Sequence, residues 1–311
     1  MLPGPILIAD KLNDRLLVVD PQGRIRWEFP RPGDLAPGQT FRIPDDAFFA
    51  NDGRDIIATQ EDDFVVTLID VARHRIVYRY GKPGVHGSGP NRLWNPDDAM
   101  VLPDGRLWIP DIKNCRLLLV AKAAHRPSKA FGNGICEHAP PHELGFPNGA
   151  FPMSNGHFLI TEIHHDWVDE LSLGGRVGFT THPPGVHYPS DTNEIRPGRY
   201  LTVDYWHPGQ IVVFDRHGKA LWRFAPTGKD ALDKPSLALP LPGGDVLAND
   251  DANHRVIVID PRTDRIVWQY GVTGRPGRAP GYLDNPDGVD LAPPRSLLMR
   301  FDAAMRLSAG R

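Results

Sequence analysis

Two segments in the second half of the sequence concentrate side chains that can exchange protons. Segment 162–167 reads EIHHDW and segment 204–209 reads DYWHPG. Histidine titrates near neutral pH, so a histidine beside a carboxylate can act as a general acid or base. The same groups can hold a transition metal, which lowers the pKa of a bound water. The candidate catalytic residues are His164, His165, His187, His207, Glu162, Asp204 and Tyr205.

A second group of oxygen-bearing side chains follows a series of prolines. Asp45, Asp97, Asn148 and Asp287 each come directly after a proline that opens an apolar segment. Carboxylate and amide oxygens suit Ca²⁺ or Mg²⁺, so their convergence would form a divalent-cation site. The alternative for these four residues is that they cap the ends of strands. The alternative for the histidines of segments 162–167 and 204–209 is that they lie in solvated loops. The expected cofactor is therefore a divalent metal (Ca, Mg or Zn) or none.

The two cysteines leave their chemistry open. Cys115 and Cys136 fit a disulfide, a pair of reduced thiols, or a metal site shared with Glu137, His138 and His142. No spacing of the H-E-x-x-H type accompanies them, so the sequence does not choose among these alternatives.

Prolines and glycines indicate which elements position these side chains. The 311 residues include 32 prolines and 31 glycines, while 41% are hydrophobic. Proline breaks helices, which excludes a helix bundle, and the apolar content excludes a disordered chain. Many short strands joined by tight turns remain, which predicts an all-β fold.

A unit of about fifty residues recurs six times. Each unit opens with a proline-led strand, continues with two apolar strands and ends with an aromatic strand. Six four-stranded antiparallel units predict a six-bladed β-propeller. We expect one domain over 1–311, with a C-terminal tail at 293–311. The expected blades are 286–292 with 5–29, 44–81, 96–132, 147–181, 188–226 and 234–271, so the C-terminal first strand would close the ring against the N-terminal strands.

The turn at 250–256, DDANHRV, resembles the D-x-x-N-H-R signature of NHL repeats. Related turns follow Asp10 and Asp111, and the inter-blade stretches 81–96 and 271–286 end in the similar L-x-N-P-D. The resemblance implies a six-bladed propeller. Propellers of this type include hydrolases, lyases and pure interaction domains, so the resemblance does not choose among these functions. Asp and Asn in such turns bond to backbone amides, so we expect a structural role for these repeated residues.

Charge and hydropathy restrict the partners. The chain carries 35 basic and 38 acidic residues, a net charge of −3, so no basic footprint for nucleic acid is expected. No run of 18 apolar residues predicts a membrane span. The first residues lack the pattern of a secretory signal, so the cytoplasm is the default expectation and secretion is left open.

These observations predict a small-molecule hydrolase or lyase. Its ligand would bind at the top of the central channel, near the fourth and fifth blades, where acid–base chemistry would proceed with or without a divalent metal. The alternative is a non-catalytic NHL-type interaction module that binds a peptide or protein on its top face.

Overall fold

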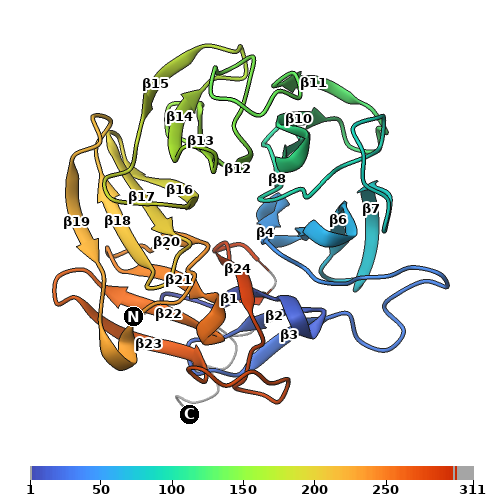
Figure 1. The fold of residues 1–311 in the computed structure, drawn as a ribbon. Coiled ribbons are helices and arrows are strands. Elements are labelled where there is room, and N and C mark those ends of the chain that lie inside the picture. The colour runs from blue at the N-terminus through green and yellow to red at the C-terminus, as the bar shows by residue number, and fades with distance from the viewer. Residues whose placement is uncertain (1, 297, 300–311) are drawn as a thin grey trace.

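Six four-stranded antiparallel sheets are arranged in a ring around a central channel (Figure 1). This computed structural model describes residues 2–296, 298 and 299. The ring confirms the predicted all-β, six-bladed propeller. Among the described residues, no helix is long and apolar enough to cross a membrane.

The blades follow the predicted order. Blade one combines β24 (Pro286–Leu291), β1 (Ile6–Asp10), β2 (Arg15–Val19) and β3 (Ile25–Phe29). Blade two comprises β4 (Ala47–Ala50), β5 (Asp55–Gln60), β6 (Val65–Asp70) and β7 (Arg75–Gly81). Blade three comprises β8 (Met100–Val101), β9 (Leu107–Asp111), β10 (Arg116–Val120) and β11 (Pro127–Phe131).

The remaining blades complete the ring. Blade four comprises β12 (Pro147–Pro152), β13 (Phe158–Glu162), β14 (Trp167–Leu171) and β15 (Val177–Thr181). Blade five comprises β16 (Pro189–Arg196), β17 (Arg199–Asp204), β18 (Gln210–Phe214) and β19 (Ala220–Phe224). Blade six comprises β20 (Ala238–Pro240), β21 (Val246–Asp250), β22 (Arg255–Asp260) and β23 (Arg265–Gly271).

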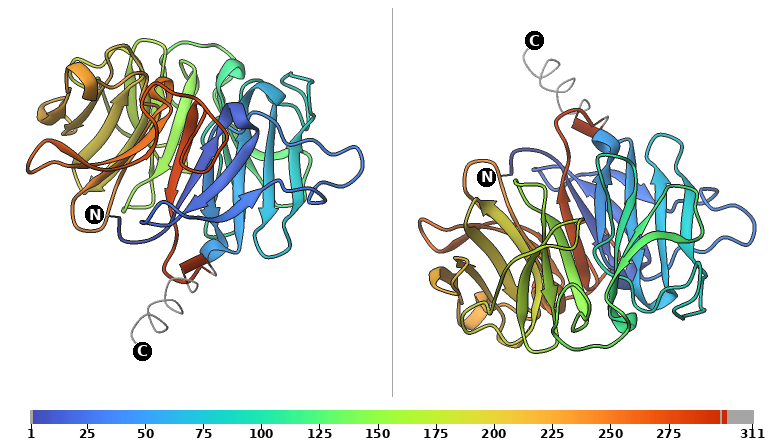
Figure 2. Two further views of the ribbon diagram at one scale, coloured as in Figure 1. Left: turned by 90° about the horizontal axis from the view of Figure 1, so that it is seen from below. Right: turned by 90° about the horizontal axis from the view of Figure 1, so that it is seen from above.

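Short 3₁₀ helices connect several strands. They are η1 (Lys11–Asn13), η2 (Asn51–Gly53), η3 (Glu61–Asp63), η4 (Ile112–Asn114), η5 (Gly228–Asp230) and η6 (Asp251–Asn253). Helices η1, η3, η4 and η6 each join the second and third strands of a blade. We call the face that carries these four turns the top face. Seen from the side, η1 and η2 lie at opposite faces of the ring (Figure 2).

The C-terminal strand closes the ring. Strand β24 pairs with β1 in antiparallel register, Ile6 opposite Leu291 and Ile8 opposite Val289. Of the predicted tail, residues 293–296, 298 and 299 are described, and the buried Leu298 packs against the apolar core of blades one and two. The rest of the tail, 297 and 300–311, lies outside the described residues.

Aromatic side chains on the fourth strands connect neighbouring blades. Trp27 Nε1 of blade one donates to the carbonyl oxygen of Val71 in blade two at 3.1 Å. Trp268 Nε1 of blade six likewise donates to the Pro21 carbonyl of blade one at 2.9 Å. These rings combine apolar area with one polar contact, which suits a packed interface. The aromatic position of the repeat therefore has a structural role.

A second repeated device stabilises the top-face turns. In blade one, Asp10 Oδ2 accepts from Asn13 Nδ2 at 2.9 Å and from Arg15 Nε at 2.7 Å. Its Oδ1 accepts the backbone N–H of Asp284 in the preceding inter-blade loop at 2.7 Å. The same three contacts recur around Asp111 and around Asp250. We call each set a turn triad; their contacts confirm the structural role expected for the repeated Asp, Asn and Arg.

The backbone approaches the turn of blade six closely at the end of its fourth strand. Gly271 has φ +94°, and a Cβ there would lie 2.2 Å from the His254 carbonyl oxygen. We expect Gly271→Ala to lower the free energy of unfolding by roughly 1–3 kcal/mol, measured by urea denaturation. The matched control is Gly89→Ala, where a Cβ meets no atom within 4 Å. Equal stability of the two variants would contradict this account.

Candidate functional site

The mouth of the channel on the top face holds a polar cavity of about 170 Å³. Two columns of the repeat supply most of its wall. One column is the residue after each leading proline, and the other is the residue after each second strand. The lining residues are Lys11, Asp45, Glu61, Asp97, Ile112, Lys113, Asn148, Ile163, Tyr188, Ser190, Tyr205, Ser236 and Asp287.

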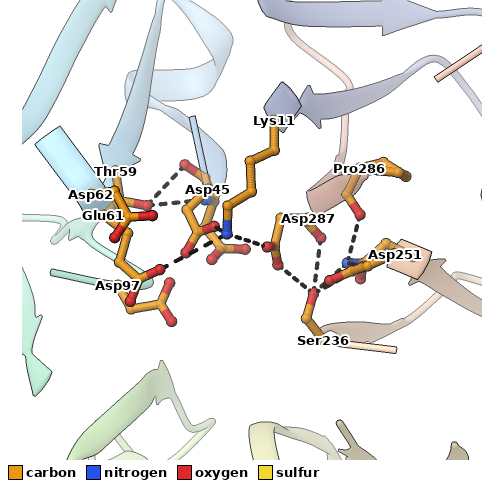
Figure 3. Close-up of polar contacts among 12 residues, drawn as sticks. Lys11, Asp45, Thr59, Glu61, Asp62, Asp97, Ser236, Asp251, Pro286 and Asp287 are labelled. Carbon is orange, nitrogen blue, oxygen red and sulfur yellow. Dashed lines mark hydrogen bonds and ion pairs between the residues drawn. The ribbon is translucent and has the colours of Figure 1, made fainter. Parts of the chain in front are cut away.

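Lys11 lies among the carboxylates of this cavity (Figure 3). Its Nζ contacts Asp45 Oδ1, lies 2.9 Å from Asp287 Oδ2 and lies 3.8 Å from Glu61 Oε2. The Lys11 side chain is only 14% exposed, so its ammonium interacts with these acids in a largely desolvated space. The ammonium thus lies between two of the predicted metal ligands, Asp45 and Asp287.

The other two predicted metal ligands lie farther round the same ring. Asn148 Nδ2 donates to Ser190 Oγ at 3.2 Å, and Asp97 Oδ1 accepts the backbone N–H of Asp98 at 3.0 Å. All four predicted ligands line one cavity. A divalent cation among them stays a prediction.

The charges of the cavity depend on burial and on Lys11. Burial opposes the charge on Lys11, but the carboxylates of Asp287 and Asp45 raise its pKa above the ordinary value. Burial also opposes ionisation of Asp287, and the ammonium of Lys11 lowers its pKa. In contrast, burial and the neighbouring Asp287 raise the pKa of Asp45 well above its usual range. The cavity therefore combines a permanent cation with carboxyls that hold protons more tightly than usual.

Two tyrosines form the blade-five wall of the cavity. The rings of Tyr188 and Tyr205 lie 5.4 Å apart. Burial raises the pKa of each phenol above its ordinary value. Both hydroxyls consequently stay protonated at neutral pH and can act as donors. Tyr205 was predicted as a site residue, whereas Tyr188 was not.

Asp204, another predicted site residue, accepts hydrogen bonds from the loop that leads into blade five. Its Oδ1 accepts the backbone N–H groups of His187 and Tyr188, both at 3.0 Å. Its Oδ2 accepts from Gln210 Nε2 at 2.8 Å. Asp204 thus occupies the carboxylate position of a turn triad, and an amide replaces the arginine. Through these bonds it positions Tyr188 and Tyr205.

Glu162 occupies the same position in blade four, but there the arginine is replaced by Trp167. His138 Nδ1 lies 3.2 Å from Glu162 Oε2, and the backbone N–H of Gly145 donates to the same oxygen at 2.6 Å. The ring of His138 stacks on Trp167 with the centroids 4.0 Å apart. Sequence reasoning placed His138 only with the cysteine loop and missed its contact with Glu162.

Both partners of this pair are uncharged at neutral pH. Burial and the nearby Asp169 raise the pKa of Glu162 to about 9. Burial, with His182 and His165 nearby, lowers the pKa of His138 to about 4. A protonated carboxyl therefore lies beside a neutral imidazole, and the proton stays on the carboxyl because its pKa is the higher of the two.

The remaining predicted histidines form two separate groups. His164 and His165 stack with centroids 3.8 Å apart, and each offers a nitrogen within 4.8 Å of a Glu137 oxygen. His207 is 69% exposed, and its Nδ1 lies 3.1 Å from Asp233 Oδ1 at blade six. The exposed His187 lies between these groups, with its ring 6.2 Å from Trp206.

The cysteines form a disulfide. Cys115 and Cys136 are bonded, with a Cα–Cα distance of 5.1 Å. Of the alternatives left open by the sequence, the metal site with cysteine ligands and the pair of free thiols are therefore wrong. The bond ties the loop before blade four to the turn triad of blade three. It also fixes the backbone carbonyl of Cys136, which lies 2.8 Å from His164 Nδ1.

No family model matches the sequence, and no curated protein matches it. The resemblance to NHL repeats therefore stays a prediction.

Solved structures share the fold. A protein of unknown function from Bacteroides caccae matches with a TM-score of 0.64 at 14% identity, covering 92% of this chain and 98% of that chain. Selenomethionine-substituted virginiamycin B lyase from Staphylococcus aureus matches with a TM-score of 0.57 at 16% identity, covering 86% and 84%. A streptogramin B lyase matches with a TM-score of 0.53 at 15% identity, covering 74% and 68%. At these identities the likeness shows the fold alone.

The raised pKa of Glu162 predicts a pH dependence of stability. The unfolded chain releases this proton near the ordinary pKa of 4.5, whereas the folded chain keeps it until about pH 9. Stability contributed by protonated Glu162 is therefore lost as the pH rises toward 9. At pH 6.5, the ordinary value for histidine, half of the unfolded chains carry a charge on His138, and the opposing slope that this adds ends about one pH unit higher.

We expect Glu162→Gln to flatten the fall in Tm between pH 6.5 and 9 relative to the unsubstituted protein. Glutamine matches the shape of the protonated acid, and the exposed Glu137→Gln is the control. Parallel Tm curves for the protein and Glu162→Gln would show that Glu162 is ionised in the folded state.

Proposed function

We propose that this protein is a lyase-type enzyme that binds a small molecule over the channel mouth and cleaves it by acid–base chemistry. The observation that supports this most strongly is the cavity itself, where a buried ammonium, several carboxyls and two protonated phenols converge. Sites of this kind, with shifted pKa values in a concave pocket, are typical of catalysis. The shared fold with streptogramin B and virginiamycin B lyases is consistent with it.

The side chains suit an elimination. The carboxylate of Asp287, whose pKa is lowered by the ammonium of Lys11, would accept a proton from a carbon of the substrate. The C–H electron pair would become a carbon–carbon double bond, and the bond to the leaving group would break. Tyr188 or Tyr205 would give its proton to the leaving atom, and the ammonium of Lys11 would stabilise negative charge as it develops.

The serines of the cavity favour elimination over acyl transfer. Ser236 Oγ donates to Asp287 Oδ1 at 2.5 Å, and Ser190 Oγ accepts from Asn148. Nucleophilic serines are activated by a neighbouring base, most often histidine. Here each hydroxyl is instead part of the ring that shapes the cavity. We therefore rank a lyase above the hydrolase that the sequence left equally open.

The predicted histidines belong to this proposal as groups around the substrate. His164 and His165 lie on the top-face turn of blade four, and His187 lies in the loop between blades four and five. Ile163 of the first turn and Tyr205 of the blade-five turn enter the cavity wall. A ligand larger than the cavity would extend over these turns. Their imidazoles would then bind or orient it, and Trp206 would offer an aromatic surface.

The exposed Trp206, 52% accessible, also supports the second candidate function. Exposed aromatic residues are enriched where proteins bind proteins. An NHL-type interaction module would use this top face to bind a peptide or protein partner. It would not depend on the charge of Lys11 inside the channel, which separates the two proposals.

We expect turnover to depend on the cavity. The assay is a panel of lactones together with quinupristin, which is present in a structure of catalytically inactive virginiamycin B lyase from Staphylococcus aureus, followed by mass spectrometry. Elimination opens a ring without change of mass, whereas hydrolysis adds the mass of one water. Lys11→Met and Tyr205→Phe should each lower kcat/KM by about 10²–10³-fold.

The control is Tyr78→Phe, whose hydroxyl donates to the Ala124 carbonyl at a blade interface away from the cavity. It should retain full turnover. Turnover that survives both cavity substitutions would contradict the proposal. A protein partner bound equally by all three variants, without turnover, would support the interaction module.

A further inference from the structure

Three carboxylates each lie two residues after a leading proline, one position beyond the column that contains the predicted metal ligands. They are Asp46, Asp98 and Asp191, contributed by blades two, three and five. Their exposed fractions are 4%, 0% and 2%, and each offers an oxygen within 4.8 Å of the other two. We call them the buried acid trio.

Four oxygens of the trio have no donor among the described residues. Neither oxygen of Asp98 accepts a hydrogen bond from the described part of the chain. The same holds, within those residues, for Oδ1 of Asp46 and Oδ1 of Asp191. A buried carboxylate without a donor or a cation is strongly disfavoured, so these oxygens require a ligand or a proton.

Two glycines of the repeat let the backbone approach the trio closely. A Cβ at Gly149 would lie 2.4 Å from Asp191 Oδ1 and 2.9 Å from the hydroxyl of Thr161. A Cβ at Gly288 would lie 2.6 Å from Asp46 Cα and 2.8 Å from Asp46 Oδ1. The Thr161 hydroxyl is itself buried and without a partner among the described residues. Asp191 Oδ1 and the Thr161 hydroxyl therefore lie beside the same glycine, with no side chain between them.

The ammonium of Lys11 does not compensate the trio but the ring of carboxylates at the channel mouth. The ammonium of Lys11 bonds to Asp45 and Asp287, at the level of the cavity. Burial raises the pKa of each member of the trio well above its usual range. Like-charged neighbours add to this effect, as Asp98 does for Asp46. A positive charge at the trio would offset both the cost of burying the carboxylates and the repulsion between them.

We propose that the buried acid trio binds a hard divalent cation, of which Ca²⁺ and Mg²⁺ are the representatives. The donor set consists of oxygens alone, which suits these ions and not zinc, whose sites in proteins favour nitrogen and sulfur. The ion connects blades two, three and five across the channel, below the cavity. The site differs from the predicted ring of Asp45, Asp97, Asn148 and Asp287, and it does not depend on the proposed lyase activity.

The test uses the full chain after dialysis against a chelator. Calorimetric titration with CaCl₂, and separately with MgCl₂, should show saturable binding of one ion per chain. At 100 times Kd, the ion should raise Tm by about 5 °C. Asp98→Asn should abolish both effects. In chelator, Asp98→Asn should be at least as stable as the unsubstituted protein, because it removes a buried acid without a partner.

Two matched variants separate the alternatives. Asp290→Asn replaces another acid of a first strand, whose Oδ2 accepts the backbone N–H of Phe49 at 2.8 Å, and should bind the ion normally. Asp287→Asn removes one acid of the ring of Asp45, Asp97, Asn148 and Asp287, which we call the upper ring, and should also retain the ion. The proposal is overturned if neither ion binds, if Asp98→Asn binds normally, or if Asp287→Asn alone loses the ion. Asp191→Asn replaces Asp98→Asn if the latter does not fold.

Discussion

The dominant constraint in this propeller is that a carboxylate taken out of water needs a compensating charge or a proton. Burying an ion costs hydration free energy on the order of several kcal/mol. Only a close partner of opposite charge, or a proton, compensates this loss. In blades one, three and six the partner is the arginine of a turn triad, as Arg255 is for Asp250 at 2.7 Å. The same constraint explains why the repeat keeps an aspartate and an arginine five residues apart.

The candidate site is found where this pairing changes. Blade five substitutes an amide for the arginine and places Tyr188 and Tyr205 at the channel. Blade four substitutes Trp167, and Glu162 keeps its proton beside His138. Within the channel, Lys11 compensates the upper ring, whereas the buried acid trio has no basic partner among the described residues. Chemistry and cation binding are therefore expected where the structural pairing is absent.

The six blades, their order and the closing strand could all be predicted, because prolines, turns and apolar strands repeat at a visible period. The turn triads were also predictable from the recurrence of Asp, Asn and Arg. The site was harder to locate. The sequence directed attention to Asp10 and Asn13 and their equivalents, whose side chains bond within the turns. Lys11, which follows Asp10 directly in the sequence, lines the channel mouth and was missed.

Local geometry explains the other omissions. In blades one, four and five the register shifts directly after the leading proline, as in a β-bulge. A bulge interrupts the alternation of side chains, so two consecutive residues can face the channel. Position directly after a leading proline assigned Asp45 and Asp97 to the channel mouth. The bulge accounts for Asp191 in blade five, whereas Asp46 and Asp98 precede strands β4 and β8 and were not singled out. His138 was missed because it comes from the preceding loop, 24 residues before Glu162.

The most direct test of this account is an anomalous difference map from crystals grown with Ca²⁺. The account predicts one peak at the buried acid trio, with oxygens of Asp46, Asp98 and Asp191 at about 2.3–2.6 Å. It also predicts the ammonium of Lys11 between Asp45 and Asp287 above that peak. Carboxyl groups of the trio bonded directly to one another, with no peak between them, would show that shared protons neutralise them and would contradict the cation site.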